Sequence, residues 1–170
     1  LVPTESQNAF LVHELNGEAD LAVCLKNDVL NQLNERKTHG EFKIEDLSLL
    51  SIVVEELSHF NYYCEKALRN LSISPLELEV QAEVDKFAFA LNCLEQKNED
   101  QFRDEIFSIM FDEFKLGEWV KEEEKGRYEA AHHIARSFCR KMLSETASRK
   151  SDRDWFRAFY RLDSSQKTKV

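Results

Sequence analysis

The chain has 170 residues, of which 42% are hydrophobic and 32% charged, with a formal net charge of −9. This length and composition exclude an intrinsically disordered protein and predict a single globular domain with its own core. Four glycines and two prolines leave little material for turns, which favours long helices over many short strands. The acidic balance argues against general binding to nucleic acid.

The cysteines and the hydropathy pattern predict a cytoplasmic protein. No CxxC pair is present, and each cysteine lies in an apolar stretch, which predicts reduced, buried thiols rather than a disulfide framework or a zinc ribbon; the four are Cys24, Cys64, Cys93 and Cys139. No run of about 18 apolar residues occurs, so no membrane-spanning segment is predicted. No signal-peptide pattern opens the sequence.

The first ordered element is predicted to be a small β-hairpin. Two apolar runs, residues 10–15 and 20–25, flank Asn16-Gly17, and this dipeptide is typical of two-residue hairpin turns. The competing interpretation is one helix that breaks at Gly17. Residues 1–8, before these runs, are predicted to be flexible.

Helices are predicted for most of the remaining chain. Asn27 or Asp28 can cap a short helix to about Lys37, and a long helix is expected from near Asp46 to Asn70. A second long helix is expected from Ser74 to about residue 95, because an N-cap serine is followed by proline at the first helical position and by glutamate three residues after the cap.

Three further helices follow in the prediction. Two cover about 102–117 and 121–144, and the last is capped by Ser151 or Asp152 and holds Trp155, Phe156, Phe159 and Tyr160. Residues 164–170 are polar and are predicted to be a flexible tail. The predicted fold is mainly α, a compact bundle of about six helices in one domain over residues 9–163, with the hairpin at its edge.

The two long helices each carry an acidic residue within an apolar face. On a helical wheel Glu56 falls between Leu49 and Phe60, and His59 lies three residues further along the same face. Glu83 projects from the edge of the apolar stripe of the second long helix. Glu55 is expected to point the other way, toward Ser48, Ser51 and Tyr62, and to be solvated.

A third ionisable group is predicted to face the interior from the helix over 121–144, where His132 lies on the apolar face and His133 faces away. Glu56, His59, Glu83 and His132 could therefore form a site for zinc, iron or manganese. Di-iron carboxylate bundles use an E-x-x-H motif on a helix, but they need two such motifs and two further glutamates, and one motif is found here. The zinc-protease motif HExxH is absent.

A polar network without a cofactor is the preferred interpretation of these residues, because buried carboxylates are costly unless they are paired. Glu56 would accept hydrogen bonds from His59 or a tyrosine (Tyr62, Tyr63 or Tyr128), and Glu83 from Arg127 or Lys86. For His132 alone, a core histidine is preferred over a ligand. A metal-free acid/base pair of the two glutamates is the third alternative.

Charge is distributed unevenly along the chain. Residues 131–170 hold ten Lys/Arg and four Asp/Glu, a net charge of +6, and the other 130 residues hold thirteen and twenty-eight, a net charge of −15. Packing of the basic end on the acidic body is preferred over docking of an acidic partner. The basic-aromatic stretch 149–161 suggests a surface for single-stranded nucleic acid, but its rings at i, i+1, i+4 and i+5 favour core packing.

Residues 54–60 (VEELSHF) and 76–87 (LELEVQAEVDKF) resemble the core of a family of uncharacterised bacterial proteins, and Arg127-Tyr128, Phe138-Cys139 and residues 159–162 fit the same pattern. The resemblance implies a bacterial, cytoplasmic, single-domain protein and assigns no catalytic role. The expected function is a non-enzymatic interaction or regulatory module that uses its acidic body or its basic C-terminal helix as the contact surface. The alternative is a metal-binding protein or metal-dependent enzyme.

Overall fold

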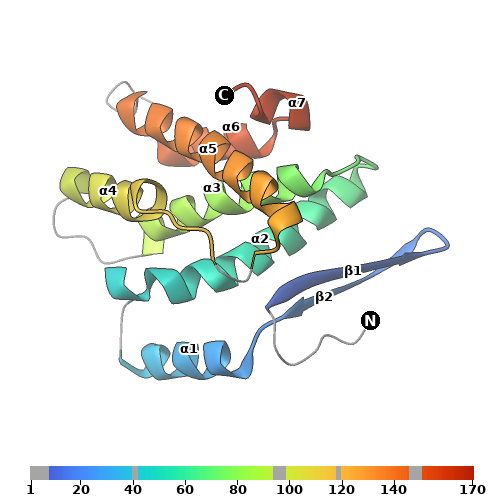
Figure 1. The fold of residues 1–170 in the computed structure, drawn as a ribbon, viewed down its shortest axis with the longest axis horizontal. Coiled ribbons are helices and arrows are strands. Elements are labelled where there is room, and N and C mark those ends of the chain that lie inside the picture. Colours follow the sequence, from blue (N-terminus) through green and yellow to red (C-terminus); the bar gives the residue numbers. More distant parts are fainter. Residues whose placement is uncertain (1–7, 40–41, 94–98, 118–119, 146–150) are drawn as a thin grey trace.

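Figure 1 shows the computed structural model of the chain, which describes residues 8–39, 42–93, 99–117, 120–145 and 151–170. These residues form a two-stranded hairpin and seven α-helices, which confirms the predicted mainly-α bundle. The elements are β1 (Ala9–Leu15), β2 (Glu18–Cys24), α1 (Asn27–His39), α2 (Leu47–Leu68), α3 (Pro75–Cys93), α4 (Glu99–Phe107), α5 (Glu122–Glu145), α6 (Asp152–Tyr160) and α7 (Ser164–Lys167). A 3-10 turn, η1 (Ile44–Asp46), precedes α2, and a π-helical turn, η2 (Ser108–Asp112), follows α4.

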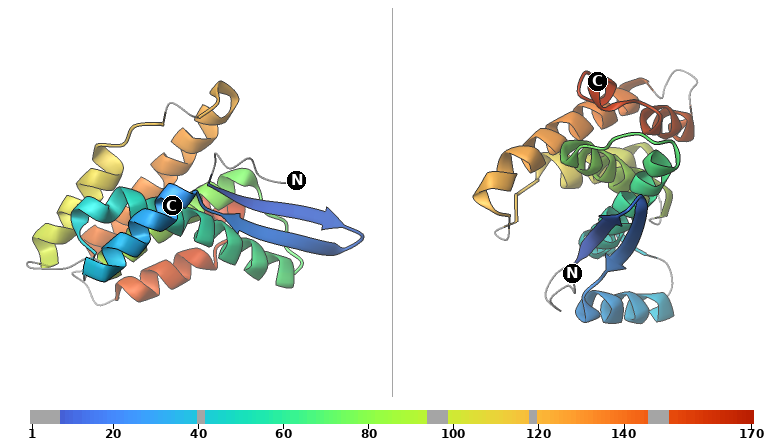
Figure 2. Two further views of the ribbon diagram at one scale, coloured as in Figure 1. Left: turned by 90° about the horizontal axis from the view of Figure 1, so that it is seen from below. Right: turned by 90° about the vertical axis from the view of Figure 1, so that its right-hand side faces the viewer.

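The hairpin is antiparallel, and the Asn16-Gly17 turn sets its register. Both turn residues have positive φ angles, 53° for Asn16 and 82° for Gly17, as the type I′ turn requires. The prediction of a hairpin is therefore confirmed, and the competing broken helix is excluded. Phe10 of β1 packs edge-to-face on Phe60 of α2 with ring centroids 6.1 Å apart. The turn end of the hairpin projects away from the helices (Figures 1 and 2).

Local signals define the turn between α2 and α3. Asn70 adopts a left-handed φ of 54°, and the N–H of Leu71 donates to the carbonyl of Lys66 at 3.0 Å, which closes α2. Ser74 Oγ accepts from the N–H of Glu77 at 3.1 Å and caps α3. The chain turns back here, so α2 and α3 pack side by side. The hairpin and α1 lie against α2, and α5 and α6 cover α3 on the far side (Figure 1).

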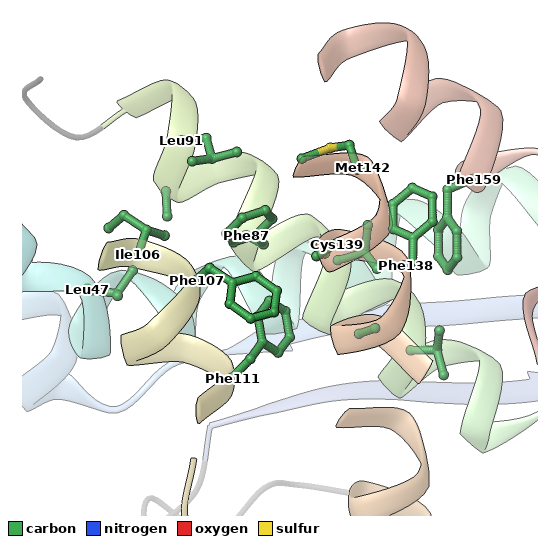
Figure 3. Close-up of a cluster of buried hydrophobic side chains, with 14 of the residues drawn as sticks. Leu47, Phe87, Leu91, Ile106, Phe107, Phe111, Phe138, Cys139, Met142 and Phe159 are labelled. Atoms are coloured by element: carbon green, nitrogen blue, oxygen red, sulfur yellow. The ribbon is translucent and has the colours of Figure 1, made fainter. Parts of the chain in front are cut away.

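The hydrophobic core lies between α3, the α4–η2 segment, α5 and α6 (Figure 3). Phe87 of α3 is fully buried, with its ring centroid 6.0 Å from that of Phe107 and 5.6 Å from that of Phe111. Phe138 of α5 meets Phe159 of α6 at 4.2 Å, as the aromatic spacing in α6 predicts. The apolar side of α3 is thus occupied, so polar side chains from α3 must find partners on α2 and α5.

The helix predicted over 102–117 is shorter than expected. Regular α-helix ends at Phe107, a π-helical turn continues to Asp112, and Phe114 lies beyond it with 36% of its surface exposed. A π turn holds more residues than an α turn, so it shifts the side-chain register. Phe111 is buried as a result, while Ile109 and Met110 are half-buried beside an open groove.

The structure also differs from the predicted flexible tail over 164–170. Residues 164–167 form α7, capped by the Asp163 side chain, which accepts from the N–H of Gln166 at 2.8 Å. The side chain of Lys167 is buried with 1% exposure. A polar segment is expected in solvent unless the body of the protein offers buried hydrogen-bond acceptors. Here α2 and α3 provide such acceptors for Lys167. Of residues 1–8, which are predicted to be flexible, residues 1–7 lie outside the described part, and the Asn8 side chain accepts from the N–H of Lys26 at 2.9 Å.

The described cysteines are free, with Cys139 buried and Cys24 and Cys64 half-buried, so the expected deep burial holds for one of the three. The side chain of Cys93 lies outside the described residues. Among the helices that the structure describes, none has the length and apolar character needed to cross a membrane.

Candidate functional site

Glu56 lies on α2 and is buried, as its wheel position predicts, with 8% of its surface exposed. Burial raises the pKa of this carboxyl to about 7, although the nearby His59 opposes the shift and Glu55 adds to it. The backbone N–H of Phe10, in β1, hydrogen-bonds to the carboxylate. The hairpin therefore contributes directly to the environment of Glu56.

His59 forms its ion pair across the helix interface, with Nε2 3.5 Å from Oε2 of Glu79 on α3. Burial alone would lower the pKa of His59, but Glu79 and the neighbouring Glu55 and Glu56 raise it above the usual value. Oε1 of Glu79 lies 3.4 Å from Nε of Arg127, which comes from α5. Glu79 thus links α2, α3 and α5 through one charge network.

Glu83 forms a different pair, because Lys86 lies one turn further along α3. Lys86 Nζ donates to Glu83 Oε1 at 2.5 Å and to Glu55 Oε2 at 3.0 Å. Burial works against the lysine charge, but the two carboxylates outweigh it and raise the pKa of Lys86. The predicted partner of Glu83 is confirmed for Lys86, whereas the prediction of a solvated Glu55 is wrong, since this side chain completes the pair from α2.

His132 is buried on α5, and the exposed His133 faces away, as predicted. Nε2 of His132 donates to the carbonyl of Phe111 at 3.1 Å, and the His132 ring stacks on Phe114 with centroids 3.8 Å apart. Burial lowers the pKa of His132, which keeps the ring neutral. Nδ1 is buried and has no hydrogen-bond partner among the described residues.

The four predicted ligands are therefore engaged in separate interactions: Glu56 with the hairpin, His59 with Glu79, Glu83 with Lys86, and His132 with the η2 backbone. Across residues 8–39, 42–93, 99–117, 120–145 and 151–170, no three His, Cys, Asp or Glu side chains are grouped as ligands of one metal ion. This arrangement does not support the predicted zinc, iron or manganese site.

An open groove of about 380 Å³ lies next to the Glu83–Lys86 pair. We call it the η2 groove. Its walls combine apolar and polar side chains from η1, α2, α3, η2 and the segment after η2, namely Ile44, Glu45, Leu47, Ser48, Ser51, Glu83, Lys86, Ile109, Met110 and Phe114. Phe114 also stacks on His132, so this histidine supports one wall from behind. Of the residues that the sequence analysis names, Glu83 and Lys86 therefore line the groove, and His132 contacts its wall residue Phe114.

Besides the Glu83–Lys86 group, a second polar cluster lies between α2 and α3, and the sequence analysis does not predict it. Tyr62 OH donates to Glu77 Oε1 at 2.5 Å, and Lys66 Nζ lies 3.0 Å from the same oxygen. Gln81 Nε2 donates to Asp85 Oδ1 at 2.8 Å. The one sequence pattern that indicates this cluster is the i, i+4, i+8 spacing of residues 77, 81 and 85 on α3. A polar row of this kind usually faces solvent, so it does not by itself predict a buried cluster.

Comparisons with protein-family models, curated proteins and solved structures found no match to this chain. The resemblance to a bacterial family therefore remains a prediction, and function has to be inferred from the chemistry of the groove and the two polar clusters.

Proposed function

We propose that the protein is a non-enzymatic binding module whose η2 groove receives a basic, amphipathic segment of a partner protein. The observation that carries the proposal is the composition of the groove: apolar walls stand next to carboxylates that outnumber the lysine between them. A segment with apolar anchors on one face and lysine or arginine beside them would match both features.

The apolar walls supply the contact area for such anchors. Five apolar side chains line the groove: Ile44, Leu47, Ile109, Met110 and Phe114. Unbranched methionine can adapt to differently shaped partners. Two of these side chains, Ile109 and Met110, belong to the π-helical turn. Such turns are rare, and they occur frequently at functional sites. These features support a surface built for binding.

The charges select the sign of the partner. With Glu55 and Glu83 ionised, the Lys86 cluster carries one net negative charge, and the exposed Glu45 adds another at the rim. The 130 residues outside 131–170 carry a net charge of −15, so the surrounding field has the same sign. Electrostatic complementarity increases association rates and excludes partners of like charge. A basic segment is therefore favoured over an acidic one.

The proposal also retains the predicted bacterial source and cytoplasmic location. The free thiols of Cys24, Cys64 and Cys139 support a reducing compartment.

A designed peptide tests the proposed function. A fluorescent helix of about 18 residues, with leucine on one face and lysine on the other, should bind and change its anisotropy. The double variant Met110→Ala/Phe114→Ala should bind it about tenfold or more weakly, because truncating apolar anchors at a groove removes contact area. Affinity should also fall with added salt.

The matched control is Leu68→Ala, which removes an equally apolar side chain that is 86% exposed at the end of α2, away from the groove. This variant should bind the peptide like the wild type, and a leucine/glutamate peptide of the same length should not bind. Equal binding of both peptides, or equal weakening by Leu68→Ala and the double variant, would contradict the proposal.

A further inference from the structure

Lys167 occupies an unusual position for a lysine. It belongs to α7, the last and shortest helix in Figure 1, yet it is 1% exposed. Lysine is almost never fully buried unless its amine is paired. The position of Lys167 therefore indicates that acceptors for an amine exist on the body of the protein.

Three side chains from three different helices contact the amine. Nζ donates to Tyr62 OH of α2 and to Gln81 Oε1 of α3, both at 2.6 Å. It also lies 3.9 Å from the centroid of the Tyr62 ring and 5.1 Å from that of Phe159, on α6. Aromatic faces and oxygen acceptors are the groups that recognise an ammonium ion.

These acceptors are held in place by partners other than Lys167. Tyr62 OH donates to Glu77 at 2.5 Å, and Gln81 Nε2 donates to Asp85 at 2.8 Å. Asp85 is fixed in turn by the hydroxyl of Ser58 at 2.6 Å. The site is thus formed by α2, α3 and α6, and α7 supplies the lysine that fills it. Side chains that are already oriented lose little entropy when they bind a ligand.

Carboxylates near the site partly offset the cost of burying a cation there. Glu77 and Asp85 provide two carboxylates, while Lys66 pairs with Glu77 at 3.0 Å and provides one positive charge. Glu65 adds a further negative charge nearby, so removing Lys167 would take one positive charge from this group. Burial lowers the pKa of Lys167 to about 7, although Glu77 and Asp85 oppose the shift. Both the amine and the ammonium form can therefore donate to Tyr62 and Gln81 near neutral pH.

We infer that Tyr62, Gln81 and Phe159 form a binding site for a primary amine on a linear alkyl chain, and that Lys167 occupies it as an internal ligand. The α7 segment, residues 164–170, is then a competitor for amine ligands, and the lysine side chain of another polypeptide has the chemistry to replace it.

Chemical rescue tests this inference. Lys167→Ala removes the three methylene groups and the amine beyond Cβ, and n-propylamine supplies the same atoms. The variant should melt about 5 °C or more below the wild type, because the buried side chains of Tyr62 and Gln81 lose a hydrogen-bond donor. Added n-propylamine should raise its melting temperature in a saturable way. The same amine should raise the melting temperature of the wild type much less, because it must first displace Lys167.

Three controls separate an amine site from a general solvent effect. n-Propanol, which lacks the amine, should not rescue Lys167→Ala. Lys169→Ala, at an exposed lysine of the same segment, should neither lower the melting temperature nor respond to amine. Adding Gln81→Leu to Lys167→Ala should abolish rescue. An undiminished melting temperature of Lys167→Ala, or equal rescue by n-propanol, would overturn the inference.

If Lys167→Ala does not fold, hydrogen exchange on the wild type decides the question. n-Propylamine should accelerate amide exchange in the α7 segment by displacing Lys167, whereas n-propanol at the same concentration should not. A lysine-bearing peptide and its norleucine counterpart then distinguish a polypeptide ligand from a free amine. Exchange rates that n-propylamine leaves unchanged would refute a displaceable internal ligand.

Discussion

Replacing Glu77 with glutamine is expected to destabilise the protein by about 3–5 kcal/mol, the usual cost of removing one partner from a buried ion pair. Glu77 is 3% exposed and accepts from both Tyr62 OH, at 2.5 Å, and Lys66 Nζ, at 3.0 Å. Glutamine has nearly the same shape and can still accept from Tyr62. The loss would therefore come from the charge of Lys66, which would be left buried without a counterion.

Urea unfolding at pH 7 measures the loss as a shift of the midpoint at constant slope. Glu122→Gln is the matched control, because Glu122 forms an exposed i, i+3 pair with Lys125, and such pairs contribute about 0–1 kcal/mol. The double variant Lys66→Met/Glu77→Gln should recover part of the stability, since it removes the stranded charge. If Glu77→Gln were no more destabilising than Glu122→Gln, the buried cluster would not be an ion-pair network.

Features that a few neighbouring residues determine could be predicted from the sequence. Asn16-Gly17 specified the hairpin turn, because both residues tolerate positive φ. Ser74 and Pro75 specified the start of α3. The Glu83–Lys86 pair is also local, since residues three apart on a helix are neighbours.

Features that depend on how helices meet could not be predicted in this way. His59 was expected to pair with Glu56 on its own helix, but it pairs with Glu79, because the packing of α2 on α3 decides which turns face each other. Tyr62 was expected near the solvated side of α2, but it is fully buried, and Lys167, 105 positions later, donates to its hydroxyl. Neither contact has a signature in a single helix.

The groove combines both kinds of feature. The apolar spacing of Ile109 and Met110 is a local signal, but these two side chains line the groove from a π turn, which helical spacing does not predict. Helical periodicity assumes a regular register, and the π turn over Ser108–Asp112 interrupts it. Of the four residues predicted as a site, Glu83 alone lines the groove, and the irregular backbone of η2 supplies two other lining residues.

The wild type is expected to lose about 3 kcal/mol of stability as the pH rises from 4.5 to 7 because of Glu56 alone. Its pKa is raised from 4.5 to about 7 in the folded protein, so across this range the folded state holds a proton that the unfolded state has released. The contribution is fully present below pH 4.5 and is lost as the pH rises through 7. The raised pKa of His59 acts with the same sign.

Glu56→Gln should flatten this profile, because the amide mimics the protonated carboxyl and can still accept from the N–H of Phe10. The variant should match the wild type near pH 4.5 and exceed it at pH 8 by about 2–3 kcal/mol, measured by urea unfolding across the pH range. Glu123→Gln, at an exposed position on α5, should leave the profile unchanged. If Glu56→Gln instead weakened the protein at pH 8, its ionised carboxylate would be a stabilising ligand there, and a bound cation at Glu56 would become the better explanation.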